Sequence, residues 1–423
     1  MTVKRIKSAH KETVSATDSF YPRLRTSIEP IPIKGQDGEI LIGLRDTLEL
    51  NSRILWLPQD LFYILRFFDG EHSALDIRAE YLRKFGTFLL EEQLLQFIDQ
   101  LDDYYLLDND RAMQRMREFI DKYRELPARQ AICAGSCYAD DPETLQRELE
   151  TYVRKIEAPE RLQHLYGQQI RAFVVPHIDI RLGGPVYAHA YQVLRNSPPA
   201  DLYIILGIGH QGLANNFALT EKDFDTPFGP VKTDVDLVRN IDKHSTIDFL
   251  RDEIVHINEH SVEFQTVFLK HFIKTDFRIL PILCSFSSSA YFEDGSEKER
   301  LYDFVSALKA ALQDYKGTVC FVASIDLAHV GPKYGDSFQP SPTFLAHVEQ
   351  NDRSVLNALS QFDLDAFQRI VIGNDNRFRI CGYSALTTML MTMQPAHGEL
   401  LAYDSAVMDA SRSTVTFASM VFH

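Results

Sequence analysis

The sequence predicts an α/β fold in which helices flank a mainly parallel β-sheet, with a small helical domain in front of it. Four apolar runs rich in Val, Ile, Leu and Phe indicate strands buried on both faces, namely 171–176, 202–208, 277–286 and 318–325. Helical patterns alternate with them at 186–195, 262–273 and 302–315. Such alternation is typical of a parallel sheet covered by helices. The 423 residues, 45% of them hydrophobic, supply enough apolar material for full cores.

Composition narrows the range of partners. The chain has 44 Lys+Arg against 59 Asp+Glu and a formal net charge of -15, and a negative field repels phosphate backbones and anionic lipid. The sequence has no basic patch, and no apolar run approaches the roughly 20 residues of a spanning helix. We therefore expect neither nucleic acid nor membrane as a partner. Five scattered cysteines and a basic start without a signal-peptide apolar run favour a reducing cytoplasm.

Three segments follow from the pattern along the chain. Residues 1–37 are polar and basic and end in a Pro/Gly-containing stretch, which indicates an extended N-terminal segment. Residues 38–127 become helical after a short strand-like opening, and residues 128–423 carry the α/β pattern. The helices expected in the middle segment are 58–68, 73–86 and 91–107, followed by a charged linker helix at 111–125.

The helical segment 38–127 resembles the PqqD-like, winged-helix modules that recognise peptides. The resemblance rests on three phrases: Trp56-Leu57, Phe68-Asp69-Gly70, and the end of the third helix from Leu101 to Leu107. It implies peptide recognition by this domain. The alternative is a helical appendage that packs on the main domain or makes a dimer.

Polar side chains cluster where the predicted strands end. The first strand is followed by His177 and Asp179, the second by His210, and the fourth by Asp326 and His329. Two further clusters, Asn258-Glu259-His260 and Arg379-Ile380-Cys381-Gly382, occupy loops before helices. In open α/β sheets the carboxyl ends of the strands face the ligand crevice. We therefore expect these residues to converge.

Imidazoles that converge with a thiolate or a carboxylate can hold a reactive iron, copper or zinc ion. Cys381 directly precedes a predicted helix, whose N-terminal dipole is expected to lower the thiol pKa and favour the thiolate. The same feature would serve a nucleophile. Cys133 and Cys137 form a C-x3-C pair, but no second pair exists to complete a structural zinc site.

One literal motif match is misleading. Residues 207–212 read Gly-Ile-Gly-His-Gln-Gly after a strand, which matches the dinucleotide motif G-x-G-x-x-G. That motif should open a long helix, whereas Asn215-Asn216 and the turn-rich 225–230 predict a short strand and a loop. The sequence also contains no G-x-x-x-x-G-K-[ST], H-E-x-x-H or G-x-S-x-G. Nucleotide, zincin and serine-hydrolase functions are therefore not expected.

Taken in order, the motifs after residue 130 resemble the MEMO family. The matching phrases are Ala134-Gly135-Ser136-Cys137-Tyr138, Val175-Pro176-His177, Leu206-Gly207-Ile208-Gly209-His210, Glu259-His260-Ser261-Val262-Glu263, Ser324-Ile325-Asp326-Leu327-Ala328-His329, Ile380-Cys381-Gly382 and the C-terminal Val421-Phe422-His423. The resemblance implies a fold similar to class III extradiol ring-cleaving dioxygenases. It implies His177, His210 and Cys381 as metal ligands and His260 as the acid/base residue. It also implies an association with radical-SAM and AMMECR-like proteins.

The chain departs from the family pattern at several positions. Ile178-Asp179-Ile180 stands where Ala-Gly-Tyr usually follows the first His, Gln211 replaces a second His, and Cys137 replaces an aromatic residue. These changes bear on pocket shape and on substrate choice, while the ligand set is intact. Asp179 is either a carboxylate that orients a ligand His or a surface turn residue.

Four functions remain open from the sequence. The first is a redox metalloenzyme with iron(II) or copper, with zinc as a further option, in which His260 moves protons and Asp326 and His329 line or brace the pocket. Its substrate would be a small aromatic molecule or a peptide. The second is a metal- or peptide-binding component that serves a radical-SAM enzyme. The third is metal-independent hydrolysis with Cys381 as nucleophile, and the last is a purely structural protein.

Overall fold

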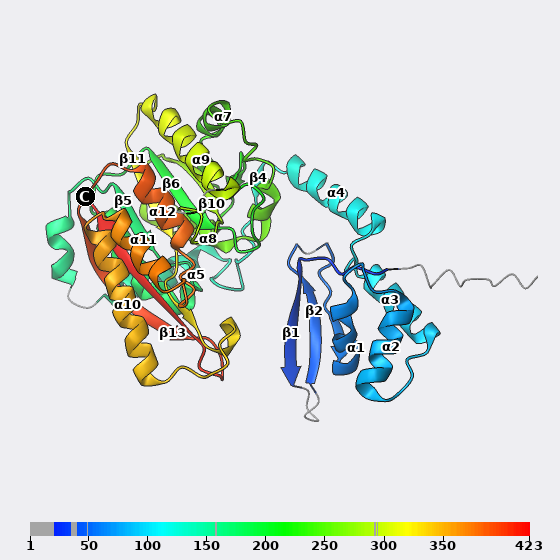
Figure 1. Cartoon of the computed structure of the whole chain (residues 1–423). Coiled ribbons are helices and arrows are strands. Elements are labelled where there is room, and N and C mark those ends of the chain that lie inside the picture. The colour runs from blue at the N-terminus through cyan, green and yellow to red at the C-terminus, as the bar shows by residue number, and fades with distance from the viewer. Residues whose placement is uncertain (1–20, 35–39, 49, 157–158, 292, 294) are drawn as a thin grey trace, which may run out of the picture. The chain divides into compact units, whose positions relative to one another are not determined.

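The computed structural model describes residues 21–34, 40–48, 50–156, 159–291, 293 and 295–423. Internal contacts divide the chain into two compact units, Met1–Glu125 and Leu126–His423 (Figure 1). Within the expected N-terminal segment 1–37, residues 1–20 and 35–37 lie outside the described residues. Among the described residues, no helix combines the length and the apolar character needed to cross a bilayer.

The first unit contains a three-stranded antiparallel sheet in the order β1-β2-β3. The sequence predicted only an extended segment and a short strand, so this sheet corrects that expectation. Pro30 and Pro32 are two residues apart, so their backbone nitrogens, which carry no hydrogen, lie on the same side of this outer strand, and an edge strand tolerates proline where that side is unpaired. The strands are β1 (Ile28–Lys34), β2 (Ile40–Asp46) and β3 (Leu55–Pro58).

The helices of the first unit follow the predicted capping signals. Ser73 accepts a hydrogen bond from the Asp76 N–H while the Asp76 carboxylate accepts from Ser73, and Gly86 ends the helix in the left-handed conformation at φ 70°. The apolar faces enclose a separate small core around Ile64, Leu94 and Leu101. The helices are α1 (Gln59–Ile64), the 3-10 turn η1 (Leu65–Phe67), α2 (Ala74–Phe85), α3 (Glu91–Asp103) and α4 (Asp110–Glu125).

The second unit is built on a nine-stranded sheet with a parallel centre, which confirms the predicted fold class. Its main path runs β12-β14-β5-β11-β6-β10-β7, with β13 beside β14 and β9 beside β10. The four predicted strands form its centre and are mutually parallel. They are β5 (Ala172–Val175), β11 (Val319–Ser324), β6 (Leu202–Ile208) and β10 (Arg278–Cys284). The others are β7 (Phe217–Leu219), β9 (Lys232–Thr233), β12 (His329–Val330), β13 (Gly398–Val407) and β14 (Thr414–Phe422).

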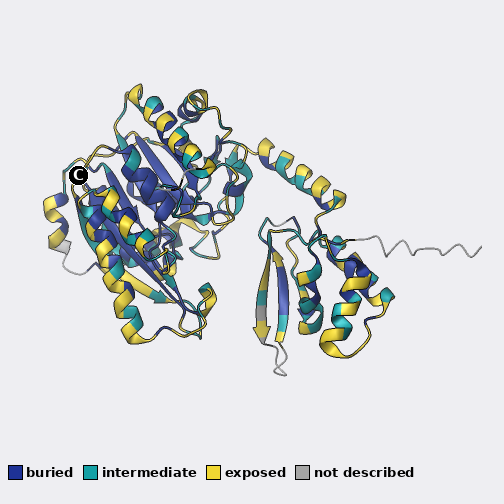
Figure 2. Ribbon diagram, viewed as in Figure 1, coloured by how far each residue is buried: buried dark blue, intermediate teal, exposed yellow. Residues whose placement is uncertain are grey.

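Helices cover both faces of this sheet, because successive strand residues point into two different cores. Ile204 and Leu206 pack with one helix layer, whereas Tyr203 and Ile205 pack with the other. The strands and the helix faces that cover them are buried (Figure 2). The first layer contains α7 (Val235–Lys243), α9 (Ser296–Gln313), α10 (Pro342–Ser360), α11 (Leu364–Gly373) and α12 (Tyr383–Thr392). The second contains α5 (Pro142–Arg154), α6 (Ile180–Arg195) and α8 (His260–Phe272).

Short elements connect these layers. A two-stranded parallel ladder joins the start of the second unit to a later loop. Its strands are β4 (Ala128–Arg129) and β8 (Asp223–Phe224), and the 3-10 turns are η2 (Pro159–Leu165), η3 (Glu253–Asn258) and η4 (Pro332–Tyr334).

A buried carboxyl group beside β14 gives the folded unit a pH-dependent stability. Asp352 is fully buried, and its Oδ2 accepts hydrogen bonds from Tyr403 Oη at 2.9 Å and Thr416 Oγ1 at 2.6 Å. Burial raises the pKa of Asp352 from 3.8 to about 6. The folded state therefore binds this proton more tightly than the unfolded chain does. The resulting stabilisation, about 3 kcal/mol, is complete below pH 3.8 and is lost as the pH rises through 6.

We expect Asp352→Asn to remove this pH dependence. Between pH 7.5 and 5, the wild type should gain about 1.4 kcal/mol of unfolding free energy relative to the variant. Denaturant unfolding of both proteins at the two pH values measures this difference. Parallel pH profiles for the two proteins would contradict the prediction.

Candidate metal centre

The carboxyl ends of three neighbouring strands carry the candidate residues. In the sheet β11 lies between β5 and β6, so Asp326 emerges between His177 and His210. The rings of His177 and His210 meet at 5.0 Å between centroids. Parallel strands bring their carboxyl ends to one edge of the sheet, which is why residues far apart in sequence converge here.

His177 is held in one tautomer. The ring is buried, and its Nδ1 lies 3.0 Å from the carbonyl oxygen of Ser324, to which only a protonated nitrogen can donate. The lone pair therefore sits on Nε2, which lies 3.4 Å from Cys381 Sγ. Burial, together with the neighbouring His210 and His260, lowers the pKa of His177. The ring is consequently neutral, the form that a metal ligand requires.

Cys381 reaches this point from the loop before α12. Its thiol donates to the Asp326 carbonyl at 3.3 Å and accepts from the Asp326 N–H at 3.4 Å. Gly382 permits the approach, because a Cβ there would lie 2.6 Å from Ile325 Cβ. Burial, followed by the charge of Asp326, raises the pKa of Cys381. The lowered pKa expected from the helix N-terminus is therefore wrong, since desolvation outweighs the dipole.

His210 is held by the carboxylate of Glu259, which the sequence placed in a polar cluster without assigning it a role. Glu259 Oε2 accepts from His210 Nδ1 at 2.9 Å and from the His210 N–H at 3.3 Å, which leaves Nε2 as the free donor atom. Glu259 also caps α8 through the Ser261 N–H at 2.9 Å. Removal from water lowers the pKa of His210, but the Glu259 carboxylate more than offsets this, and the net shift is upward.

His260 lies beside both ligand candidates. Its ring stacks on His210 at 5.2 Å with an interplanar angle of 9°, and it meets His177 edge-on at 5.4 Å. Its Nδ1 lies 3.5 Å from the other oxygen of Glu259. Burial lowers the pKa of His260 despite that carboxylate. The ring is therefore neutral near pH 7 and able to accept a proton.

Asp326 braces the site and His329 borders it. One carboxylate oxygen of Asp326 accepts from the His177 and Ile178 N–H groups at 3.0 and 3.2 Å, and the other lies 3.7 Å from His177 Nε2. Burial raises the pKa of Asp326 to about 7. His329 donates from Nδ1 to the Leu327 carbonyl at 3.1 Å and packs against Tyr334.

Two overlapping donor groups result among the described residues: His177, His210 and Cys381, and His210, Glu259 and His260. Within each group the ligand atoms lie within 4.8 Å of one another. Two imidazole nitrogens and one sulfur form a donor set suited to iron, copper or zinc. The first group therefore fits a metal ion by its chemistry, while His329 belongs to neither group.

A buried ion pair supports the turn that carries Glu259 and His260. Arg129 is fully buried and pairs with Glu263 on α8, and its Nη2 donates to the Glu259 carbonyl at 2.7 Å. The same Glu263 carboxylate accepts from Tyr138 Oη at 2.5 Å and from the Cys133 N–H at 2.9 Å. Nothing in the sequence indicated Arg129, although Tyr138 and Glu263 lie in the motifs that resemble the MEMO family.

The structure decides the role of Asp179, which the sequence left open, and agrees with the rejection of the dinucleotide motif. Asp179 caps α6 and pairs with Arg181 at 2.6 Å, as a surface turn residue does. The Gly-Ile-Gly-His phrase opens no helix, since turns and then β7 follow it. Gly207 instead allows close packing of α8, because a Cβ there would lie 2.6 Å from Ser261 Oγ.

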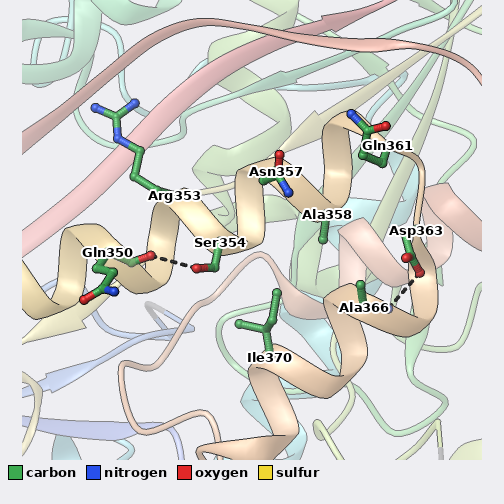
Figure 3. A pocket seen from close by; sticks show the side chains of 9 residues that line it. All are labelled: Gln350, Arg353, Ser354, Asn357, Ala358, Gln361, Asp363, Ala366 and Ile370. Atoms are coloured by element: carbon green, nitrogen blue, oxygen red, sulfur yellow. Dashed lines mark hydrogen bonds between the residues drawn. The ribbon is translucent and has the colours of Figure 1, made fainter.

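The surface hollow in Figure 3 is unrelated to this centre. It lies between α10 and α11, has a volume of about 470 Å³ and is open to solvent. Its Arg353 already pairs with Glu349 at 3.1 Å and covers the Tyr403 ring. It contains no His or Cys side chain and therefore offers no alternative metal site.

Fold and site together define a class: α/β proteins with a parallel-centred sheet and a His/Cys donor set at its carboxyl edge. The family model described as Memo-like protein matches residues 129–421. The chain therefore belongs to the Memo-like family. That match begins after the first unit, so the PqqD-like character of residues 38–127 stays a prediction.

Curated relatives agree with this assignment. A MEMO1 family protein of Aquifex aeolicus is 28% identical over 90% of this chain and 95% of its own length. One of Thermus thermophilus is 25% identical over 78% of this chain and 92% of its own. One of Methanococcoides burtonii is 30% identical over 62% of this chain and 86% of its own. The Aquifex match is longer than the second unit alone, so it extends into the first.

Proposed function

We propose that this Memo-like protein is a metalloenzyme that binds iron(II) or copper through His177, His210 and Cys381 and carries out dioxygenase-like chemistry. The supporting observation is the convergence of His177, His210 and Cys381, whose ligand atoms lie within 4.8 Å of one another while the protein holds Nδ1 of each histidine. A thiolate ligand shifts the preference toward copper, zinc or an electron-rich iron. When bound, a redox-active ion with open positions would supply the electron transfer that O2 chemistry requires.

The protein's own groups prepare the donors. The Ser324 carbonyl and the Glu259 carboxylate each accept a hydrogen bond from Nδ1–H of a ligand histidine, which directs Nε2 inward. Asp326 accepts from the His177 N–H and holds Cys381 through its own backbone, so one residue positions two ligands.

The remaining residues suit proton handling. His260 stacks beside His210 and is partly open to solvent, so it can accept a substrate proton at a ring nitrogen and return it. Asp326 lies close enough to His177 to stabilise positive charge there. His329 and Tyr334 line the border of the site and would contact a small aromatic molecule or a peptide.

A metal- or peptide-binding component is the second candidate function, and the separate first unit favours it. That unit has its own hydrophobic core, and the Aquifex relative's match extends into it. In this version, residues 38–127 recruit a peptide, and the partners are radical-SAM and AMMECR-like proteins. The five cysteines are unpaired, which supports a cytoplasmic location.

Oxygen uptake distinguishes the two candidates. The protein is first loaded with iron(II) or Cu(I) under anaerobic conditions. It is then mixed with O2 and a panel of catechols and aromatic peptides in an oxygen electrode. The enzyme proposal predicts substrate-dependent uptake in the wild type and in the surface control Glu349→Gln, and its loss in His260→Gln with metal still bound. Peptide binding by the metal-loaded protein without oxygen uptake would favour the binding component instead.

Removing the Glu259 charge should weaken metal binding without removing a proposed ligand. In Glu259→Gln the His210 Nδ1–H loses its carboxylate acceptor, and loss of such partners typically costs 10- to 100-fold in metal affinity. Competitive titration against a chromophoric chelator measures the change, with Glu349→Gln as the matched control. Unchanged affinity would show that Glu259 does not orient His210 for binding.

A further inference from the structure

Cys133 and Cys137 lie in one turn after β4, outside the donor groups. The Cys137 N–H donates to the Cys133 carbonyl at 2.8 Å, which closes the turn and places the two cysteines at neighbouring positions. The apex residues Gly135 and Ser136 are exposed, and Gly135 has φ 77°. The apex of the turn is therefore accessible to a small oxidant, while Cys133 itself belongs to the core.

The two sulfurs differ in the way a redox-active pair requires. Cys137 is partly exposed, and the hydrogen bond from Cys133, with a smaller contribution from the Ser136 hydroxyl, lowers its pKa to about 7 despite partial burial. Cys133 is only 8% exposed, and its hydrogen bond to Cys137 and its burial raise its pKa. At neutral pH, Cys137 is thus substantially thiolate and Cys133 a thiol held against it.

The other three cysteines lack these properties. Cys284 and Cys320 are fully buried, and burial raises the pKa of each. Cys381 is likewise shifted upward. All five cysteines are described by the structure, and Cys137 alone combines access to solvent, a lowered pKa and a second cysteine in the same turn.

We propose that Cys133 and Cys137 form a redox-active dithiol that peroxide converts into an intrachain disulfide. The Cys137 thiolate attacks one oxygen of H2O2, giving Cys137 sulfenic acid and hydroxide, which takes up a proton. The Cys133 sulfur then displaces the sulfenic oxygen as water and gives up its own proton. Overall, two thiols and H2O2 become one disulfide and two waters, and a small thiol reverses the change.

Closure requires a modest local movement. A disulfide needs Cβ atoms about 3.5–4.5 Å apart, and the turn that joins Cys133 to Cys137 is not helical, since Gly135 between them has φ 77°. The apex between the two cysteines is exposed and can adjust to bring the two sulfurs together. Formation of the disulfide would also affect α8, since the Cys133 N–H donates to Glu263 on that helix at 2.9 Å.

The test uses metal-free, full-length protein treated with an equimolar amount of H2O2, followed by alkylation and peptide mass spectrometry. The wild type should lose 2 Da per chain and show a Cys133–Cys137 link that dithiothreitol reverses. Cys133→Ser should leave a sulfenic acid on Cys137 that dimedone traps, and Cys137→Ser should show neither product. Cys320→Ser, the buried control, should form the disulfide as the wild type does.

Alkylatable Cys133 and Cys137 in peroxide-treated wild type, with oxidation confined to Cys381, would overturn the proposal. A link between any other two cysteines would also overturn it. Circular dichroism of each variant before treatment identifies any that fails to fold, and the wild-type measurement alone still decides the result. Because no metal is present, the outcome is independent of the proposed metal function.

Discussion

Alanine at His177 or at Cys381 is expected to reduce bound iron or copper from about one ion per chain to background. Each substitution removes one of three donor atoms that lie within 4.8 Å of one another. Losing a partner that only orients a ligand costs 10- to 100-fold in affinity, so losing the ligand should cost more than about 100-fold. Plasma mass spectrometry of anaerobically purified protein measures the content.

The matched control for this experiment is Cys320→Ala, which removes a buried thiol outside both donor groups and should retain its metal. Equal metal content in wild type and both ligand variants would show that the ion binds elsewhere. An absence of metal in the wild type, with no uptake of iron(II), Cu(I) or Zn(II), would contradict the metalloenzyme proposal and favour the peptide-binding function.

Arg129→Met is expected to destabilise the second unit by about 3–5 kcal/mol. The guanidinium is fully buried against Glu263 and also donates to the His256 and Glu259 carbonyls. Removing it leaves a buried carboxylate without its counter-charge, which is among the most costly single changes in a protein. Denaturant unfolding followed by circular dichroism measures the loss.

A double variant separates the lost charge pair from lost packing. Arg129→Met combined with Glu263→Leu replaces both charges by apolar groups, and such replacements are often neutral relative to the intact pair. The double variant should therefore recover a large part of the lost stability. A double variant less stable than the single one would contradict the charge-based explanation and indicate that packing dominates.

The central sheet and its carboxyl edge could be predicted because continuous apolar runs identify strands buried on both faces. The hairpin of β13 and β14 goes beyond that prediction. β14 pairs antiparallel with β5 across more than 200 residues of sequence, and such a partner leaves no local signal. The N-terminal sheet was missed for a different reason: the prolines of β1 conceal an edge strand.

The candidate site, like the fold, could be predicted from the sequence only in part. Placement at strand ends was sufficient to select His177, His210 and Asp326, and the structure brings them together with Cys381. The contribution of Glu259 could not be foreseen from a helix start alone, because its acceptor role depends on where His210 lies in space. The sign of the Cys381 pKa shift likewise depends on burial, which the helix position does not report.

The central claim is that one ion is held by two histidines and Cys381. X-ray absorption at the edge of the metal that copurifies tests it most directly, because sulfur and nitrogen neighbours scatter differently. The proposal predicts one sulfur at about 2.3 Å and nitrogen or oxygen neighbours at about 2.0–2.2 Å, with the sulfur signal absent from any residual metal in Cys381→Ala. A first shell without sulfur in the wild type would contradict it.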